Sequence, residues 1–531
     1  MAMSGTRRAF ITRATALGLA PAMGAAPAAR AQTKGGILKM VVFPEPPVLV
    51  SAANSSTFPG IVSTKIHEGL CRYDEAMKPL PSLATSWTVA DDGKTITFNL
   101  RRGVTWHDGK PFTAADVQFS LEKVWKTLHP RGRTVYGAVS AVETPDDHTV
   151  VLRLNKPSPS IMLSLSAYES QVVPKHIYDG TEFNTNPSLS APIGTGPFMF
   201  KEWRRGEYIR LERNPNYWDS GKPYLDGIVI RIIPDPGATA SAFETGDVDI
   251  GFFNPVPLVD VKRLTALPSL GVETGGYQYF GAEYLLELNL RNEYLKDVRV
   301  RQAMMHAIDR QFIVDNIWFG YGKVATGPVP SSASQFYSAD VPRYPFDVAK
   351  ANSILDEAGY KPGANGMRFK IVQNYPVLSE VPRTAEYLKQ AMAKAGIEVE
   401  LKSLDLGAFI RDVYTNYDFG FTNNYIYMLS DPTIGVQRLY WSENIKKGVP
   451  FANVAGYSNP DVDRALVAAQ NEPDLAKRQA EFKEFQQLIQ RDLPLLNLFE
   501  LRLTTLYNKH VRNHAIGPDA PYASFADAYI A

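Results

Sequence analysis

Apolar residues recur at every second position in three short segments of the first half of the chain, 96–100, 150–154 and 209–211. This period places the apolar side chains on one face of a β-strand. Asp92-Gly93 precedes the first segment and is typical of a hairpin turn. The first half of the chain is therefore expected to be rich in strands.

Two helices begin at clear capping residues. Thr113 and Asp116 form a variant of the capping box, and the apolar residues after them keep helical spacing as far as Trp125. Asp297 precedes a longer helical pattern, which predicts a helix running towards Gly320.

The second half of the chain alternates between helical and strand patterns. Helical spacing predicts three helices, at 347–358, 383–395 and 474–491. Alternating or continuous apolar residues predict three strands, at 369–373, 397–401 and 495–499. Strands that alternate with helices in this way predict a parallel sheet, so the two halves point to two lobes of α/β type.

Composition excludes several classes of protein. The chain has 531 residues, 56 Lys and Arg against 55 Asp and Glu, and one cysteine. A formal charge of +1 gives no basic field for nucleic acid. One cysteine excludes an intramolecular disulfide framework and any cysteine-built metal cluster, so Cys71 is expected to be buried and inert.

The first 31 residues resemble a twin-arginine export signal. Arg7 and Arg8 precede an uncharged stretch, 14–29, and Ala29-Arg30-Ala31 gives a small-x-small cleavage pattern. The alternative is a basic N-terminal helix of a cytosolic protein. Cleavage removes four Arg, which leaves 52 basic and 55 acidic residues, a net charge of −3. The expected mature protein is periplasmic, and with no cysteine near the cleavage point it is not a lipoprotein.

Enzyme signatures are missing from the sequence. It contains no Gly-x-Ser-x-Gly elbow, no His-Glu-x-x-His and no Walker loop. His107 beside Asp108 could form a base and its orienting acid, but a turn before Gly109 is the favoured interpretation. The eight His form no metal-binding spacing. The sequence therefore predicts neither a cofactor nor a catalytic residue.

Aromatic and amide side chains gather in two short clusters. One contains Tyr277, Tyr279 and Phe280, and the other covers Asn424, Tyr425 and Tyr427 and is followed by Trp441. Such residues can stack on a small polar ligand and hydrogen-bond to it. The alternative is a set of core aromatics with paired polar tips. The cluster at 423–428 favours the ligand-binding interpretation.

Short motifs form a recognisable series along the chain, in the segments 83–117, 194–198, 214–218, 246–249, 298–310 and 457–463. The first includes His107-Asp108-Gly109-Lys110-Pro111-Phe112, and the fifth includes Val298-Arg299 and Arg301-Gln302-Ala303. In order and content the series resembles the family 5 solute-binding proteins of bacterial ABC importers, the dipeptide- and oligopeptide-binding group. The resemblance covers essentially the whole mature chain.

This resemblance implies an α/β fold of the periplasmic binding protein type II, with two lobes, an extra subdomain in the first lobe and a hinge. Expected boundaries are 32–70 with 187–275 and 490–531 for lobe I, 71–186 for the subdomain and 276–489 for lobe II. The resemblance also implies a monomer that closes on a small-molecule solute and delivers it to an ABC permease with its ATPase subunits.

One departure from the family pattern concerns the solute. Peptide-binding relatives carry an aspartate before an acidic residue-Pro pair, and that aspartate neutralises the α-ammonium of the peptide. Here the pair is Asp431-Pro432, and the position of the aspartate falls on Met428. An ammonium buried without a partner is costly. Unless Asp431 or Glu45 takes the role, the site suits a neutral or anionic solute, such as an oligosaccharide, an opine-like conjugate or an N-blocked peptide.

A secreted hydrolase is the rival interpretation, because 55 acidic residues make a close carboxylate pair easy to form by chance. The predicted solute-binding residues are Tyr277, Tyr279, Asn424, Tyr425, Tyr427, Met428, Asp431 and Trp441.

Overall fold

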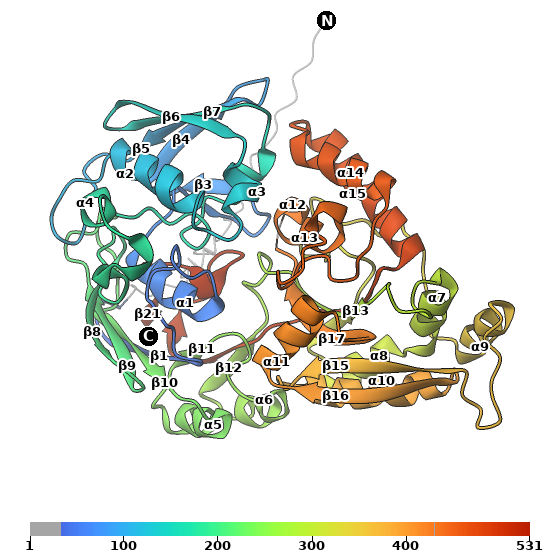
Figure 1. The fold of residues 1–531 in the computed structure, drawn as a ribbon. Helices are drawn as coiled ribbons and strands as arrows, with labels where there is room; N and C mark the ends of the chain where they lie inside the picture. Colours follow the sequence, from blue (N-terminus) through green and yellow to red (C-terminus); the bar gives the residue numbers. More distant parts are fainter. Residues whose placement is uncertain (1–32, 430) are drawn as a thin grey trace, which may run out of the picture.

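Three β-sheets of four or more strands organise the residues that the structure, a computed structural model, describes: 33–429 and 431–531 (Figure 1). The largest sheet and the smallest of the three lie on one side of the molecule, and the remaining sheet lies on the other (Figure 1). The predicted signal peptide, 1–31, lies outside the described residues and stays a prediction.

Lobe I is built on a sheet of seven strands. Their order is β12 (Leu270–Glu273), β19 (Thr505–Asn508), β11 (Ile250–Gly251), β1 (Ile37–Val42), β10 (Gly227–Ile232), β9 (Tyr208–Arg213) and β8 (Phe198–Arg204). The central strand β1 is parallel to both of its neighbours, and the other pairs are antiparallel. The helices of this lobe include α1 (Thr57–Ile66), α5 (Pro236–Thr245) and α6 (Leu258–Thr265).

The subdomain of lobe I contains an antiparallel sheet of four strands. Their order is β4 (Ala84–Val89), β5 (Thr95–Leu100), β7 (Thr149–Leu154) and β6 (Val139–Asp146). The predicted hairpin is confirmed between β4 and β5, where Gly93 has φ of 67°. The capping box is confirmed at the start of α2 (Ala114–Phe119), which continues as a π-helical segment over Ser120–Trp125.

The subdomain also contains the short α3 (Gly132–Tyr136), and beside it lies the two-stranded pair β2 (Cys71–Tyr73) and β3 (Pro79–Pro81). Cys71 is buried, as predicted, and burial raises the pKa of its thiol to about 12. The thiol therefore stays protonated and unreactive at neutral pH.

Lobe II is built on a sheet of six strands. Their order is β14 (Gly322–Val324), β18 (Leu495–Leu501), β13 (Ala282–Leu288), β17 (Phe421–Tyr427), β15 (Phe369–Pro376) and β16 (Ile397–Leu404). The predicted parallel pairing is confirmed for β15 with β16, joined through α10 (Val381–Ala393). The other main helices are α7 (Val298–Ala307), α9 (Val348–Glu357), α14 (Pro460–Asn471) and α15 (Leu475–Asp492).

The helix predicted from Asp297 towards Gly320 is wrong as one continuous element. Ile308 has φ of −97° and ψ of 117°, so α7 ends there. Asp309 then caps a new helical segment by accepting a hydrogen bond from the backbone of Phe312 at 2.9 Å. The Tyr387 hydroxyl also bonds to the backbone of Asp309. Local capping and a long-range contact outweigh the helical spacing of the apolar residues.

Two chain segments connect the two large sheets and frame the site described below. Residues 274–281 run from β12 to β13, and residues 502–504 run from β18 to β19. The strand β18 lies within 490–531, which was expected to belong to lobe I, yet it pairs with β13 and β14 of lobe II. The crossing therefore begins after Leu501.

His107 and Asp108 hold neighbouring loops together. The His107 ring bonds to the carbonyl of Gly196 at 3.0 Å and accepts from the backbone of Gly194 at 3.2 Å. Asp108 pairs with His176 at 2.7 Å. The two adjacent side chains thus reach different partners, as the turn interpretation requires. Among the described residues, no helix is both long enough and apolar enough to cross a membrane.

Candidate functional site

Aromatic rings from both lobes meet at the crossing segment 274–281. Phe280 contacts Phe253 and Tyr522 of lobe I, with ring centroids 5.0 and 5.1 Å apart, and Tyr427 of lobe II at 5.6 Å. Tyr522 stacks on Tyr168 with centroids 4.0 Å apart. We call these five residues the aromatic junction. It brings lobe I, the crossing segment and the end of β17 into direct contact.

Tyr277 fixes the two crossing segments to each other. Its hydroxyl group donates to the carbonyl of Thr504 at 3.1 Å and lies 2.7 Å from the Thr505 hydroxyl. It also accepts from the backbone of Phe253 at 3.1 Å. The ring is buried and its polar tip is fully paired, so Tyr277 orders the crossing.

Tyr279 contacts Phe280 of the aromatic junction and hydrogen-bonds to the ion pair between Glu169 and Arg131. Its hydroxyl donates to Glu169, and Glu169 holds Arg131 through two hydrogen bonds, with Nε–Oε2 at 2.9 Å and Nη2–Oε1 at 2.6 Å. The Glu169 side chain is 2% exposed, whereas Arg131 keeps 18%. Glu169 therefore orients a guanidinium group that still reaches solvent.

Arg438 approaches Arg131 from the opposite lobe. It donates to the backbone carbonyls of Gly435 at 3.0 Å and Tyr427 at 3.1 Å. Among the described residues no carboxylate lies within 4.0 Å of its guanidinium. Burial, together with the positive charge of Arg131, lowers the pKa of Arg438 to about 10. Two like charges therefore approach each other where the lobes meet, with Glu169 paired to Arg131 and the buried Glu287 acting on Arg438 from a distance beyond 4.0 Å.

Two acidic residues on β13, Glu283 and Glu287, are fully buried inside lobe II. Glu287 accepts from Tyr414 at 2.7 Å and Thr422 at 3.3 Å, and burial raises its pKa to about 7. Glu283 is fully buried beside Glu500, and both burial and that neighbouring charge raise its pKa well above the usual range. Glu283 favours the neutral form. The charge of Arg438 opposes the rise in the pKa of Glu287, so Glu287 is partly ionised at neutral pH and offsets part of the charge of Arg438, but it is protonated at acidic pH.

The strand β17 presents the second sequence cluster. Tyr425 and Tyr427 are half-buried, with ring centroids 6.3 Å apart. Asn424 is buried and points to the opposite face of the sheet, since side chains alternate along a strand. Met428 is fully buried, and its backbone donates to the carbonyl of Gly281 at 3.2 Å. Tyr427 therefore joins the aromatic junction, while Met428 packs behind it.

Asp431 is engaged inside lobe II. Both of its carboxylate oxygens accept from Nη2 of Arg478, at 2.8 and 2.9 Å, and one also accepts from the backbone of Thr433 at 2.9 Å. Asp431 is fully buried and the side chain of Arg478 is 3% exposed. The carboxylate already has a full set of donors, so nothing in this arrangement directs it towards a solute.

Trp441 and Glu45 have their own hydrogen-bond partners. Trp441 is half-buried at the end of a short helix, Gln437–Tyr440, and its carbonyl accepts from Asn453 at 3.1 Å. Glu45, weighed as a substitute acid, accepts from the Trp203 indole at 2.9 Å and from the backbone of Gly206. The structure thus brings Tyr277, Tyr279, Tyr425 and Tyr427 to the lobe interface and leaves the other four predicted residues packed elsewhere.

A cavity of about 320 Å³ adjoins the crossing segments and includes Tyr277, Lys323 and Glu500 in its wall. Among residues 33–429 and 431–531, no group of three or more His, Cys, Asp or Glu could hold a metal ion.

Sequence patterns missed Arg131, Glu169 and Arg438. Each is a single charged residue without a motif. Arg131 caps α3 of the subdomain, and α3 contacts the short helix Pro432–Gly435 of lobe II, whose last carbonyl accepts from Arg438. Their one link to a predicted residue is the hydrogen bond from Tyr279 to Glu169, which only the structure shows.

Comparison with known proteins agrees with this architecture. The family model of bacterial extracellular solute-binding proteins, family 5, matches residues 78–447. The chain is 31% identical over 495 residues to the oligopeptide-binding protein AppA of Bacillus subtilis, covering 88% of this chain and 86% of AppA. It is 27% identical to the glutathione-binding protein GsiB of Pectobacterium atrosepticum, covering 88% and 89% of the two chains.

Solved structures show the same fold. The crystal structure of Bacillus subtilis AppA with a nonapeptide has a TM-score of 0.77 at 27% identity and covers 94% of this chain and 100% of AppA. The binding protein AgaA from A. tumefacien R10, in complex with agropinic acid, has a TM-score of 0.76 at 27% identity and covers 93% and 99%. The fold is that of the type II periplasmic binding proteins. The chain belongs to family 5 of the bacterial extracellular solute-binding proteins.

Proposed function

We propose that this protein is the exported solute-binding component of an ABC importer and that its solute is small, polar and acidic, without a free ammonium group. The solute lies between the lobes against Tyr425 and Tyr427, with its acidic group on Arg131 and Arg438. An opine-like conjugate or an N-blocked peptide has this chemistry, whereas a neutral oligosaccharide would leave the arginines without an anion. The mature protein acts in the periplasm as a monomer and delivers the solute to a permease.

The approach of Arg131 to Arg438 is the observation that supports the acidic solute. Closing the lobes brings two positive charges together in a partly buried space, which is unfavourable unless an anion lies between them. Arg438 has only carbonyl acceptors among the described residues, so its guanidinium retains the capacity to bind a carboxylate. An acidic solute would thus favour the closed form directly.

The lack of a free acid for an ammonium, among the residues that the structure describes at the interface, supports the second half of the proposal. Met428 is apolar and fully buried, and Asp431 is held by Arg478. Glu169 pairs with Arg131, which leaves it a weak partner for an added cation. Among the relatives, AgaA is a complex with agropinic acid and AppA with a nonapeptide, so the fold accommodates both kinds of ligand.

Titration calorimetry of the mature protein tests this proposal. Agropinic acid and N-acetyl-L-alanyl-L-alanine serve as acidic probes, and L-alanyl-L-alaninamide serves as an amine without a carboxylate. At least one acidic probe should bind, and Arg438→Gln should weaken it about 10- to 100-fold, the effect of losing one charged hydrogen-bond partner. The exposed Arg464→Gln on α14 is the matched control and should bind normally.

Tighter binding of the amide than of the acids, or equal affinity in wild type and Arg438→Gln, would contradict an acidic solute. Recovery of each probe after incubation tests the rival hydrolase, since a transport component returns its solute unchanged. Glu283 with Glu500 is an acid pair near the interface, but Glu283 is fully buried and cannot touch a solute.

A further inference from the structure

A second cavity lies entirely on the lobe I side of the molecule, away from the lobe interface. Its volume is about 480 Å³, within the range of small-molecule sites. The wall comes from the end of α1, the β2–β3 pair, the loop 217–222 and the C-terminal segment 513–527. None of the described residues that line it belongs to 276–489, the expected extent of lobe II.

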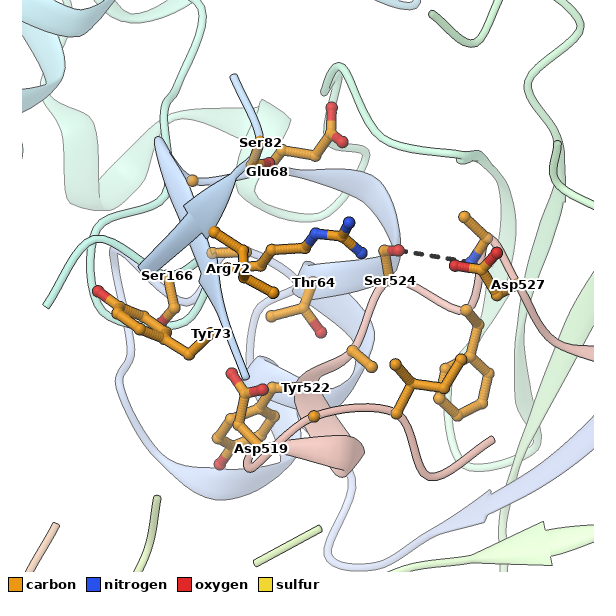
Figure 2. A pocket seen from close by; sticks show the side chains of 18 of the residues that line it. Thr64, Glu68, Arg72, Tyr73, Ser82, Ser166, Asp519, Tyr522, Ser524 and Asp527 are labelled. Carbon is orange, nitrogen blue, oxygen red and sulfur yellow. Dashed lines mark hydrogen bonds between the residues drawn. The ribbon is translucent and has the colours of Figure 1, made fainter. Parts of the chain in front are cut away.

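The charges around this cavity are uneven. Six acidic residues and two permanently charged basic residues line it. Lys222 is one of the two, and it is already paired with Asp219 at 3.0 Å and Asp527 at 2.7 Å. Arg72 is the other, and no carboxylate among the described residues lies within 4.0 Å of it. Figure 2 shows the Arg72 side chain extending across the cavity between Glu68 on one wall and Asp519 on another.

The acidic residues that line the cavity differ in their capacity to bind a ligand cation. Glu68 already accepts from Thr195, Tyr217 and Trp218, at 2.9 to 3.1 Å. Asp519 has no ion pair within 4.0 Å among the described residues. The ammonium of Lys65 lies near enough to lower the pKa of Asp519, but it donates to the carbonyl of Pro521 at 2.8 Å. Burial raises the pKa of Asp519 to about 6, so it is mostly ionised at about pH 7.5.

We infer that this cavity is a second binding site, which takes a zwitterion the size of a free amino acid or a dipeptide. The carboxylate of the ligand lies on Arg72 and its ammonium faces Asp519. A simple anion would be repelled by the surplus of acidic side chains, and a simple cation would gain nothing from the exposed guanidinium of Arg72. Ser82 and Ser524 also line the cavity; the Ser524 hydroxyl accepts from the backbone of Ala526 at 3.4 Å and can still donate its own proton to the ligand.

The two sites select opposite ligands, which makes them separable by experiment. Among the described residues the lobe interface offers no free acid for an ammonium, whereas the lobe I cavity needs an ammonium. Tyr522 is the shared wall, since it lines the cavity and also stacks in the aromatic junction. The cavity residues Arg72 and Asp519 are not part of that junction.

Calorimetric titration with L-alanyl-L-alanine at about pH 7.5 tests the inference. Wild type should show saturable binding, and Arg72→Gln and Asp519→Asn should each weaken it at least about 10-fold, as loss of a charged partner does. Both N-acetyl-L-alanyl-L-alanine and L-alanyl-L-alaninamide should lose binding at this site. Arg438→Gln should bind the dipeptide as wild type does.

Thermal unfolding of each variant checks that it folds. Ala515→Trp, which fills the cavity from the C-terminal segment and leaves both charges intact, should also abolish binding. No saturable heat up to about 10 mM dipeptide overturns the inference, because an affinity weaker than that is negligible. Binding that survives Arg72→Gln, or that is lost in Arg438→Gln, overturns it as well.

Discussion

Replacing Asp431 by Asn should unfold lobe II more easily without changing the affinity for solute. The carboxylate is fully buried and holds Arg478, whose guanidinium also donates to the carbonyl of Ala469 at 2.8 Å and lies over Phe336. Asn keeps the shape and one acceptor but leaves the arginine charge buried without a counter-charge. Breaking a buried pair on one side costs about 3–5 kcal/mol.

For a unit of about 200 residues, each kcal/mol lowers the melting temperature by about 2–4 °C, so a decrease of about 6–20 °C is expected. Differential scanning calorimetry measures this shift, and titration with an acidic probe measures the affinity. Asp340→Asn is the matched control, because its pair with Lys483 is exposed to solvent and contributes little to stability. A normal melting temperature together with a tenfold loss of affinity would refute the reasoning and place Asp431 on the solute.

Three further predictions concern other parts of the molecule. Glu287→Gln should remove a pH dependence of stability. Burial raises the pKa of Glu287 from 4.5 to about 7, so ionisation of this group in the unfolded state makes wild type less stable by about 3 kcal/mol at pH 7 than at pH 4.5. Denaturant unfolding at both pH values measures the difference between wild type and variant. Tyr425→Ala and Tyr427→Ala should each weaken an acidic solute by about 1–3 kcal/mol in calorimetry if the rings stack on it, and equal affinity in both would remove them from the site. Changing Arg7 and Arg8 to Lys should leave precursor in the cytoplasm, seen by fractionation, and unchanged periplasmic yield would show that the general secretory route suffices.

Local patterns predicted the elements of the fold better than their boundaries. The alternation at 96–100 and the capping box at Thr113 depend on neighbouring residues alone, and both are present in the structure. The helix after Asp297 breaks at Ile308, where Asp309 caps a new helical segment and Tyr387, far along the chain, bonds to the backbone of Asp309. A contact of that kind leaves no trace in local spacing.

In the candidate site, too, local patterns were predictable from the sequence and long-range contacts were not. Tyr279 and Tyr427 could be selected because aromatic clusters are visible in the sequence, and the structure places both at the lobe interface. Arg131 and Arg438 lie far apart in the sequence and carry no motif, so only the folded chain shows that they approach each other. Met428 in place of an aspartate indicated from the sequence that a negative charge is missing. The positive charges of Arg131 and Arg438 became visible only in the structure.

Mass spectrometry of the small molecules that remain bound to protein purified from the periplasm tests the central claim most directly. The account predicts a small polar compound with at least one acidic group and no free amine, released unchanged on denaturation. It should be depleted in Arg438→Gln and retained in Arg464→Gln. A neutral sugar or a peptide with a free amino terminus, bound equally by wild type and Arg438→Gln, would contradict the claim that the two arginines bind the solute between the lobes.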